Sequence, residues 1–148
     1  MWTETKEDIQ MKKDDCIFCK IANNEIPSAT IYENSDFRVI LDIAPASVGH
    51  ALIITKEHYN DIYDMDADTA AKLFSLGTAV ARALKDQLQC DGLNIIQNNG
   101  EAAGQTVRHF HMHLIPRYIG DQVNFSWDPK ESDSIELAEL AKLIRKRI

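Results

Sequence analysis

The sequence predicts a single α+β domain built on an antiparallel sheet of about five strands, with helices on one side of the sheet. Several segments have strand-like patterns, and one long segment has the period of an amphipathic helix. The chain has 148 residues and is 45% apolar, which is enough for one ordinary domain with a single core. We therefore predict one domain over residues 14–148, preceded by a loosely ordered, charged tail over residues 1–13.

Five segments have the composition or the alternation of β-strands and are bounded by turn residues. The turn at Asn34 and Ser35 joins the first two as a hairpin, and a continuous apolar run marks the third as a central strand. A glycine-containing loop joins the last two. The predicted strands are residues 29–33, 36–41, 50–54, 92–98 and 110–115.

Helical periodicity begins at Asp66 and lasts to Leu88, with small and apolar residues along one stripe and charged residues elsewhere. Such a stripe normally packs on a sheet. A second amphipathic stretch covers residues 132–147, and its basic end suits the negative C-terminal pole of a helix. Residues 20–23 are expected to form a short helical turn or a loop. The long stripe consists of Leu73, Gly77, Val80, Ala81, Leu84 and Leu88.

The most distinctive stretch places three of the five histidines at two-residue spacing, in alternation with large apolar residues. In a half-buried strand, His109, His111 and His113 share one face while the apolar residues between them share the other. The outer two imidazoles are then about 13 Å apart along the strand, too far for one metal ion to bind all three. The spacing fits better with three histidines that each contact a different part of an elongated polar substrate.

The loop before the histidine row, residues 98–106, is rich in small and polar residues. Its main-chain N–H groups and its Asn98, Gln105 and Thr106 side chains suit phosphate oxygens, although a polar loop between strands also contains such residues for structural reasons. An unprotonated imidazole can attack phosphorus to give a phosphoramidate that water later cleaves. His111, at the centre of the row, is the predicted nucleophile.

Cys16 and Cys19 form a C-x-x-C pair, which is compatible with half of a zinc site, with a redox pair or with chance proximity. The chain has three cysteines, which do not make a disulfide framework at this length. No second C-x-x-C occurs, so a zinc ion would need histidine ligands as well. We expect Cys90 to be inert near a helix end and His58 to be a surface or packing residue.

The net charge of −7 argues against broad binding of nucleic acid or of anionic membranes. No run of about 18 apolar residues occurs, and the first residues are charged rather than signal-like. We therefore expect a cytoplasmic protein without a membrane span and without an organic cofactor, in which a local site handles any anionic substrate.

The row of histidines resembles the signature of the histidine triad (HIT) family, and the likeness extends backward through Asn98, Gly104, Gln105 and Thr106. Four further motifs occur in the order seen in the Hint-like branch of small bacterial and eukaryotic members. The resemblance covers about residues 14–118 and implies the HIT fold. The four motifs are Cys16–Ile21, Ile26–Ser28, Leu41–Ile43 and Gly49–Ile54.

The resemblance also implies roles for single residues. His111 would carry a transient nucleotidyl group while its other nitrogen donates to a main-chain carbonyl, and His113 would donate on the phosphate or leaving-group side. Asp42 would hold ribose hydroxyls and Ile43 would touch the base, although Asp42 is also a residue that ends strands. The phosphate would meet Asn98, Gly104, Gln105 and Thr106.

Many Hint-like bacterial proteins complete a zinc site with the histidine of the G-H motif and with one histidine of the triad. The matching ligand set here is Cys16, Cys19, His50 and His109. Without zinc, His50 and His109 would orient the catalytic groups, and the two roles are compatible.

The implied activity is hydrolysis or transfer at the α-phosphate of purine nucleotide conjugates, such as adenosine phosphoramidates or aminoacyl adenylates, in a homodimer paired through the long helix and a strand. Three alternatives remain: a dinucleoside polyphosphate hydrolase, a nucleotide-binding module with little turnover, and a metal-dependent hydrolase that uses the histidines as ligands. The segment Pro116–Tyr118 and the acidic N-terminal extension depart from the eukaryotic Hint pattern.

Overall fold

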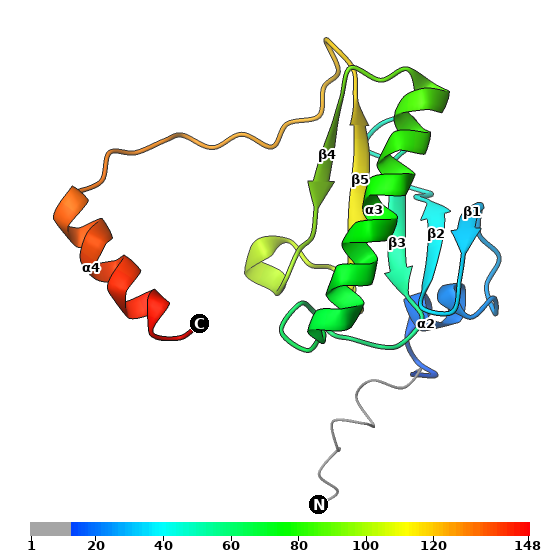
Figure 1. The fold of residues 1–148 in the computed structure, drawn as a ribbon. Helices are drawn as coiled ribbons and strands as arrows, with labels where there is room; N and C mark the ends of the chain where they lie inside the picture. Colours follow the sequence, from blue (N-terminus) through cyan, green and yellow to red (C-terminus); the bar gives the residue numbers. More distant parts are fainter. Residues whose placement is uncertain (1–12) are drawn as a thin grey trace, which may run out of the picture.

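The computed structural model describes residues 13–148, so the predicted tail lies outside the described residues apart from Lys13. Five strands form one antiparallel sheet in the order β1-β2-β3-β5-β4 (Figure 1). This confirms the predicted α+β class and the number of strands. The strands are β1 (Thr30–Glu33), β2 (Phe37–Leu41), β3 (Ala51–Thr55), β4 (Gly92–Ile96) and β5 (His111–Arg117).

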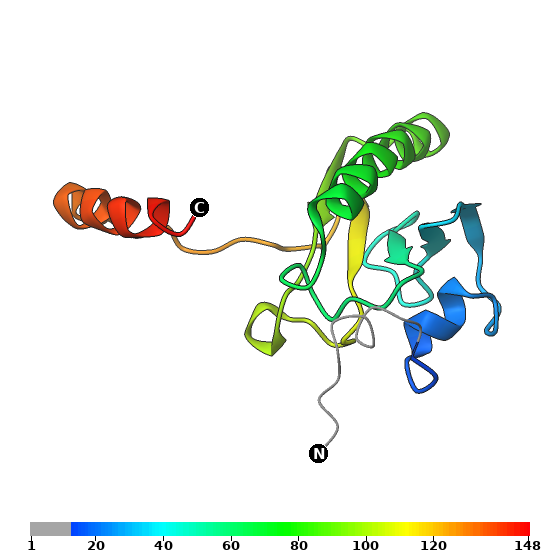
Figure 2. The same ribbon diagram turned by 60° about the horizontal axis from the view of Figure 1, so that its bottom comes forward.

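The long helix α3 (Ala67–Leu88) lies across one face of the sheet, as its apolar stripe predicts (Figures 1 and 2). The Asp66 side chain caps its first turn by accepting from the Thr69 N–H. Leu73, Val80 and Leu84 are buried against inward-facing residues of the strands. The main core fills the space between α3 and the sheet; its strand residues include Phe37, Val39, Ala51, Ile53, Met112 and Leu114.

The opposite face of the sheet carries the short helix α2 (Ile17–Ala22), so the expectation of helices on one side is wrong. Phe18 and Ile21 of α2 pack against a second cluster of Ile40, Leu52 and Ile54. Successive side chains of a strand point to opposite faces, which gives the central strands two apolar faces to cover. The continuous apolar run in β3 is the sequence signal of this double burial.

The C-terminal helix α4 (Ser134–Arg145) follows an extended segment and stands away from the rest of the domain (Figures 1 and 2). It falls within the range predicted for it, and all of its residues are exposed. A short 3-10 turn, η1 (Glu101–Ala103), lies in the loop between β4 and β5. Among the described residues, no helix is both long and apolar enough to cross a bilayer.

Candidate functional site

The alternation along β5 divides its side chains as the sequence predicts. Met112 and Leu114 point into the core under α3. His111 and His113 lie opposite Ile54 and Leu52 of β3, on the face that carries α2. His109 precedes the strand rather than belonging to it, because β5 begins at His111. The row therefore divides into two strand histidines and one histidine in the segment that leads into the strand.

His111 has a defined proton position. Its Nδ1 lies 2.7 Å from the main-chain oxygen of His109, and a carbonyl oxygen can only accept, so Nδ1 carries the proton. The lone pair is then on Nε2, the atom required for attack on phosphorus. The Phe18 ring meets the imidazole edge-on, with ring centroids 4.8 Å apart, and fixes its plane. Burial is the main cause that lowers the pKa of His111, which keeps the ring unprotonated at neutral pH.

His50 and His113 form a second chain of defined protons. The Ala46 N–H donates to Nδ1 of His50 at 3.0 Å, which leaves the His50 proton on Nε2. That atom lies 2.9 Å from Nδ1 of His113 and 3.7 Å from a carboxylate oxygen of Asp42. His50 therefore donates to His113, and neutral His113 keeps its own proton on Nε2. Burial, and then the neighbouring His111 and His50, lower the pKa of His113 to about 4.

The two strand histidines are consequently complementary. Their ring centroids are 5.0 Å apart, and at neutral pH His111 presents a lone pair where His113 presents an N–H. An imidazole with a free lone pair and an imidazole that can donate a hydrogen bond thus lie side by side on one face of the sheet. This pair is the minimum needed to attack a phosphorus atom and to stabilise the group that departs from it.

The cysteine pair lies in a different cluster from the one predicted. Cys16, Cys19, His58 and His109 place four potential metal-binding atoms within 4.8 Å of one another. His50 is not among them, since it belongs with Asp42 and His113. His58 therefore occupies the place in this cluster that the sequence predicted for His50, and its burial agrees with a packing residue and not with a surface residue. The sequence could not distinguish the two, because both histidines flank the buried strand β3.

The donor set of this cluster fits a tetrahedral metal ion. Nε2 of His109 donates to the main-chain oxygen of Thr55 at 2.8 Å, and Nε2 of His58 lies 3.2 Å from the side-chain oxygen of Asn60. Both lone pairs are thereby directed from Nδ1 toward the sulfur atoms, at 3.3 to 3.4 Å. Two thiol sulfurs and two imidazoles oriented by oxygen acceptors are the ligands and supports typical of zinc.

The side chain of Gln105 lies inside the loop between β4 and β5 and closes it through hydrogen bonds. Its side-chain N–H groups donate to the main-chain oxygens of Asn60 (2.6 Å) and Val107 (3.0 Å), and its side-chain oxygen accepts from the Gly100 N–H (2.8 Å). Both amide hydrogens are engaged, so Gln105 shapes the loop instead of donating to phosphate as predicted. Thr106 and Gly104 are exposed, and Gly104 has a φ of 86° that favours glycine.

The residues expected at the nucleoside lie just beyond β2. Asp42 accepts from the Ala44 N–H at 2.9 Å through one oxygen and directs the other toward His50. Ile43 is 97% exposed, so an apolar side chain stands in water beside this carboxylate. β4 ends at Ile96, which pairs with His113 of β5. Because the two strands are antiparallel, Asn98, two residues further on, lies near the His111 end of β5.

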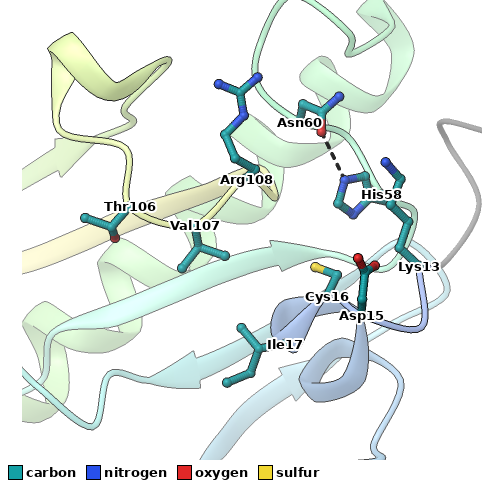
Figure 3. A pocket seen from close by; sticks show the side chains of 9 residues that line it. All are labelled: Lys13, Asp15, Cys16, Ile17, His58, Asn60, Thr106, Val107 and Arg108. Atoms are coloured by element: carbon teal, nitrogen blue, oxygen red, sulfur yellow. Dashed lines mark hydrogen bonds between the residues drawn. The ribbon is translucent and has the colours of Figure 1, made fainter.

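A cavity of about 430 Å³ opens between the segment at Lys13–Ile17 and the segment at Thr106–Arg108 (Figure 3). Cys16 and His58 of the metal-type cluster form part of its wall, and Thr106 belongs to the polar loop. Lys13 and Arg108 supply cations, while Asp15 supplies one carboxylate. The cavity thus connects the cluster with the loop next to the triad.

Sequence reasoning missed three contributors besides the cluster ligand His58. The Phe18 ring packs against His111, and the main-chain oxygen of Thr55 accepts from His109. The side-chain oxygen of Asn60 contacts His58, and its main-chain oxygen accepts from the side-chain amide of Gln105. Thr55 ends the buried strand β3 and His58 follows it, and these positions are the only signal that the sequence carries for them. Phe18 lies within the motif Cys16–Ile21, which gives no sign that its ring contacts a histidine.

Together, the sheet and the histidine row define a histidine triad protein. A HIT domain profile matches residues 23–120, and the chain belongs to the HIT family. It is 40% identical to "Protein hit" of Bacillus subtilis over 91% of this chain and 95% of that protein. It is 38% identical to adenosine 5'-monophosphoramidase HNT1 of Saccharomyces cerevisiae over 86% of this chain and 78% of that protein.

Solved structures agree with this assignment. SMU.412c from Streptococcus mutans is 44% identical with a TM-score of 0.88, over 91% of this chain and 86% of that one. A zinc-bound histidine triad protein from Mycobacterium smegmatis is 41% identical with a TM-score of 0.71, over 89% of this chain and 97% of that one. The resemblance found in the motifs is therefore confirmed in sequence and in fold.

Proposed function

We propose that this protein hydrolyses purine nucleotide conjugates at the α-phosphate, with adenosine phosphoramidates as the favoured class, through a nucleotidyl group carried transiently on His111. The observation that carries the proposal is the proton arrangement of the two strand histidines. His111 has a free lone pair on Nε2 because Nδ1 donates to the His109 oxygen, and His113 has a proton on Nε2. The yeast relative named as a monophosphoramidase supports the substrate class.

In the first step, Nε2 of His111 attacks the α-phosphorus and the bond from phosphorus to the leaving group breaks. The leaving group departs with that electron pair while the Nε2–H of His113 donates to it. In the second step, water attacks the phosphorus as the bond from phosphorus to Nε2 of His111 breaks. The proton of the water passes to Nε2 of His113, which restores both histidines, and the nucleoside monophosphate leaves. Fixed donors aimed at the phosphate typically contribute a few kcal/mol each, and Asn98, Thr106 and the N–H groups around Gly104 are the candidates.

The remaining site residues bind the nucleoside or orient His113. Asp42 has one oxygen directed at His50 and accepts hydrogen bonds from the ribose hydroxyls, and Ile43 covers the base. His50 holds the His113 proton on the outer nitrogen. The cavity beside Thr106 receives the part of the conjugate beyond the phosphate. Hydrolysis of dinucleoside polyphosphates remains an alternative, because nothing in these contacts selects an amine leaving group.

Intact mass after brief exposure to adenosine 5'-phosphoramidate tests the proposal. We expect a transient species heavier by one adenylyl group, and we expect its loss in His111→Ala together with at least about a thousandfold loss of AMP release. Lys142→Gln serves as a comparison because it lies on α4, away from the histidines and from the cavity. AMP release by His111→Ala at the wild-type rate would contradict the proposal, and binding without turnover in the wild type would favour a nucleotide-binding module.

We also propose that Cys16, Cys19, His58 and His109 bind one structural zinc ion. The zinc would hold α2 to the segment after β3 and to the segment before β5. It would supply no step of the reaction. Elemental analysis should find one zinc per chain. Because His50 lies outside the cluster, His50→Ala should retain the metal, whereas His58→Ala should lose it. The opposite result would restore the ligand set predicted from the sequence.

A homodimer is the proposed assembly. β4 is an edge strand of the sheet, with Ile95 42% exposed, and α3 beside it exposes Phe74 at 59%. An open edge with neighbouring exposed apolar residues is suited to pairing with a second sheet. This supports the pairing through the long helix and a strand that the family resemblance implies.

A further inference from the structure

The segment that carries the cysteine pair lies against the proposed nucleophile. Phe18 stands between the two cysteines in the chain, and its ring meets the ring of His111 edge-on, with centroids 4.8 Å apart. The same aromatic ring lies 6.1 Å from the ring of His109, again edge-on. A movement of the cysteines therefore reaches two histidines of the row through Phe18.

His109 connects the cysteines to His111 by a second route. Its Nδ1 lies 3.3 Å from the sulfur of Cys16 and 3.4 Å from the sulfur of Cys19. Its main-chain oxygen is the acceptor, at 2.7 Å, that keeps the proton of His111 on Nδ1. One residue thus contacts both sulfurs through its side chain and the proposed nucleophile through its main chain. A change at the sulfurs that moves His109 also moves the group that sets the His111 tautomer.

The two sulfurs lie close enough to react with each other. They belong to the four atoms that lie within 4.8 Å of one another, and both cysteines are thiols in the structure. Cys16 is the N-cap of α2, and its sulfur accepts from the N–H of Cys19 at 3.4 Å. Pairs with this C-x-x-C spacing form reversible disulfides in disulfide oxidoreductases. The redox interpretation of the motif is therefore compatible with the geometry of α2.

The surroundings give the two sulfurs different roles in such a reaction. Cys16 is partly exposed and lines the cavity of about 430 Å³, where Figure 3 shows its side chain. Cys19 is 0% exposed. A small oxidant in the cavity meets the Cys16 sulfur first, and Cys19 is placed to react with the product. Cys90 is buried beyond the end of α3 and lies outside the cluster.

We propose that Cys16 and Cys19 form a reversible disulfide in response to hydrogen peroxide, and that this modification slows the reaction at His111. The Cys16 sulfur attacks one peroxide oxygen, the O–O bond breaks, and a sulfenic acid and one water form. The Cys19 sulfur then attacks the Cys16 sulfur, the S–O bond breaks, and the hydroxide leaves with the thiol proton as a second water. Two thiols and one peroxide thus give one disulfide and two waters.

A zinc-bound pair reacts with the same balance. Two protons from the solvent then take the place of the thiol protons, and the zinc ion is released because a disulfide is not the thiolate that binds metal.

The disulfide removes what the sulfurs supply to His109. A disulfide sulfur has no proton to donate to Nδ1, and it no longer shares a metal ion with the imidazole. The new bond also draws together the two residues that flank Phe18. Both routes to His111 change at once. The effect on turnover rests on the proposed role of His111, whereas the formation of the disulfide does not depend on it.

Oxidation of the protein as isolated tests the modification. After treatment with hydrogen peroxide and removal of the excess with catalase, we expect an intact mass lower by two hydrogen atoms and a peptide map that joins Cys16 to Cys19. AMP release from adenosine 5'-phosphoramidate should fall at least about tenfold, as displacement of a reacting group predicts. Dithiothreitol with added zinc should restore it. Dithiothreitol does not reverse methionine oxidation, so recovery separates the two kinds of damage.

Two variants localise the response. Cys90→Ser is the matched control, since this cysteine lies outside the cluster, and it should lose and regain activity as the wild type does. Cys16→Ser should form no intramolecular disulfide, and peroxide should leave its AMP release unchanged. The response of each variant is the ratio of AMP release before and after treatment, so a lower starting activity of Cys16→Ser does not affect the comparison.

Nitrogen-detected NMR of the His111 ring provides a readout in the wild type that needs neither a variant nor turnover. We expect the His111 signals to shift or broaden when the disulfide forms and to return with dithiothreitol, while the circular dichroism spectrum stays the same. Persistence of both thiols after peroxide treatment would overturn the proposal. A Cys16–Cys19 disulfide that leaves the His111 signals and AMP release unchanged would also overturn it. Absence of AMP release in the reduced wild type would instead count against the proposed reaction, and the mass and NMR readouts would still decide the disulfide.

Discussion

Single main-chain groups determine which nitrogen carries the proton in the histidines of the candidate site. One main-chain carbonyl fixes the proton of His111 on Nδ1, and one main-chain N–H, from Ala46, fixes the proton of His50 on Nε2. The second constraint passes through His50 to His113. Because carbonyls only accept and N–H groups only donate, two main-chain groups are enough to give chemically identical side chains opposite roles, with a lone pair on Nε2 of His111 and an N–H on Nε2 of His113.

This arrangement predicts the tautomers that nitrogen-detected NMR should find at pH 7. We expect His111 as the Nδ1–H form and His50 and His113 as Nε2–H forms. His113 should remain neutral well below pH 6.5, because burial lowers its pKa to about 4. His50→Ala should leave the His111 tautomer unchanged while broadening or shifting the His113 signals. A proton on Nε2 of His111 in the wild-type protein would contradict the proposed attack.

At the scale of elements, α3 depends on its first turn. The carboxylate of Asp66 accepts from the N–H and the hydroxyl of Thr69, each at 2.8 Å, and from the Tyr59 hydroxyl at 3.0 Å. The cap thus ties the start of the helix to a buried tyrosine of the segment after β3. The hydrogen bonds from Thr69 lower the pKa of Asp66 from 3.8 to about 2.

Asp66→Ala should lower the free energy of unfolding by about 1 kcal/mol at pH 7, the usual cost of losing an N-cap. Since the folded-state pKa is depressed, this stabilisation is present above about pH 3.8 and is lost as the pH falls through about 2. Denaturant unfolding at several pH values measures it. Asp68→Ala, in the same turn but without a capping role, should cost a few tenths of a kcal/mol. A difference for Asp66→Ala that grows toward pH 2 would contradict this account.

The candidate sites are assembled from segments that are distant in the chain. The cysteine pair at α2, His58 after β3 and His109 before β5 meet in one cluster. Gly49, just before β3, makes a comparable long-range contact: it has a φ of 87°, and a side chain there would require Leu88 and Pro116 to shift. A Cβ atom there would lie 2.2 Å from Leu88 of α3 and 3.3 Å from Pro116 of β5.

Gly49→Ala should therefore destabilise the protein by about 2 kcal/mol or more, the sum of an unfavourable φ and of overpacking. Gly120→Ala is the matched control, because Gly120 has a φ of 84° and nothing within 4 Å of the added Cβ. It should incur only the backbone cost of about 1 kcal/mol. Thermal unfolding of the two variants gives the comparison. Equal losses would show that the contact with Leu88 contributes little.

Local patterns in the chain are sufficient to predict the main elements and the family. Alternation around Met112 and Leu114, the stripe from Leu73 to Leu88 and the motif order were enough for the sheet, α3 and the triad, because these signals are local and periodic. The folded chain is needed to see that His58 rather than His50 joins the cysteines, that Gln105 closes its loop, and that α4 stands apart. Those facts depend on which distant segments meet, and residues of one type at the ends of one strand carry no local signal of their partners.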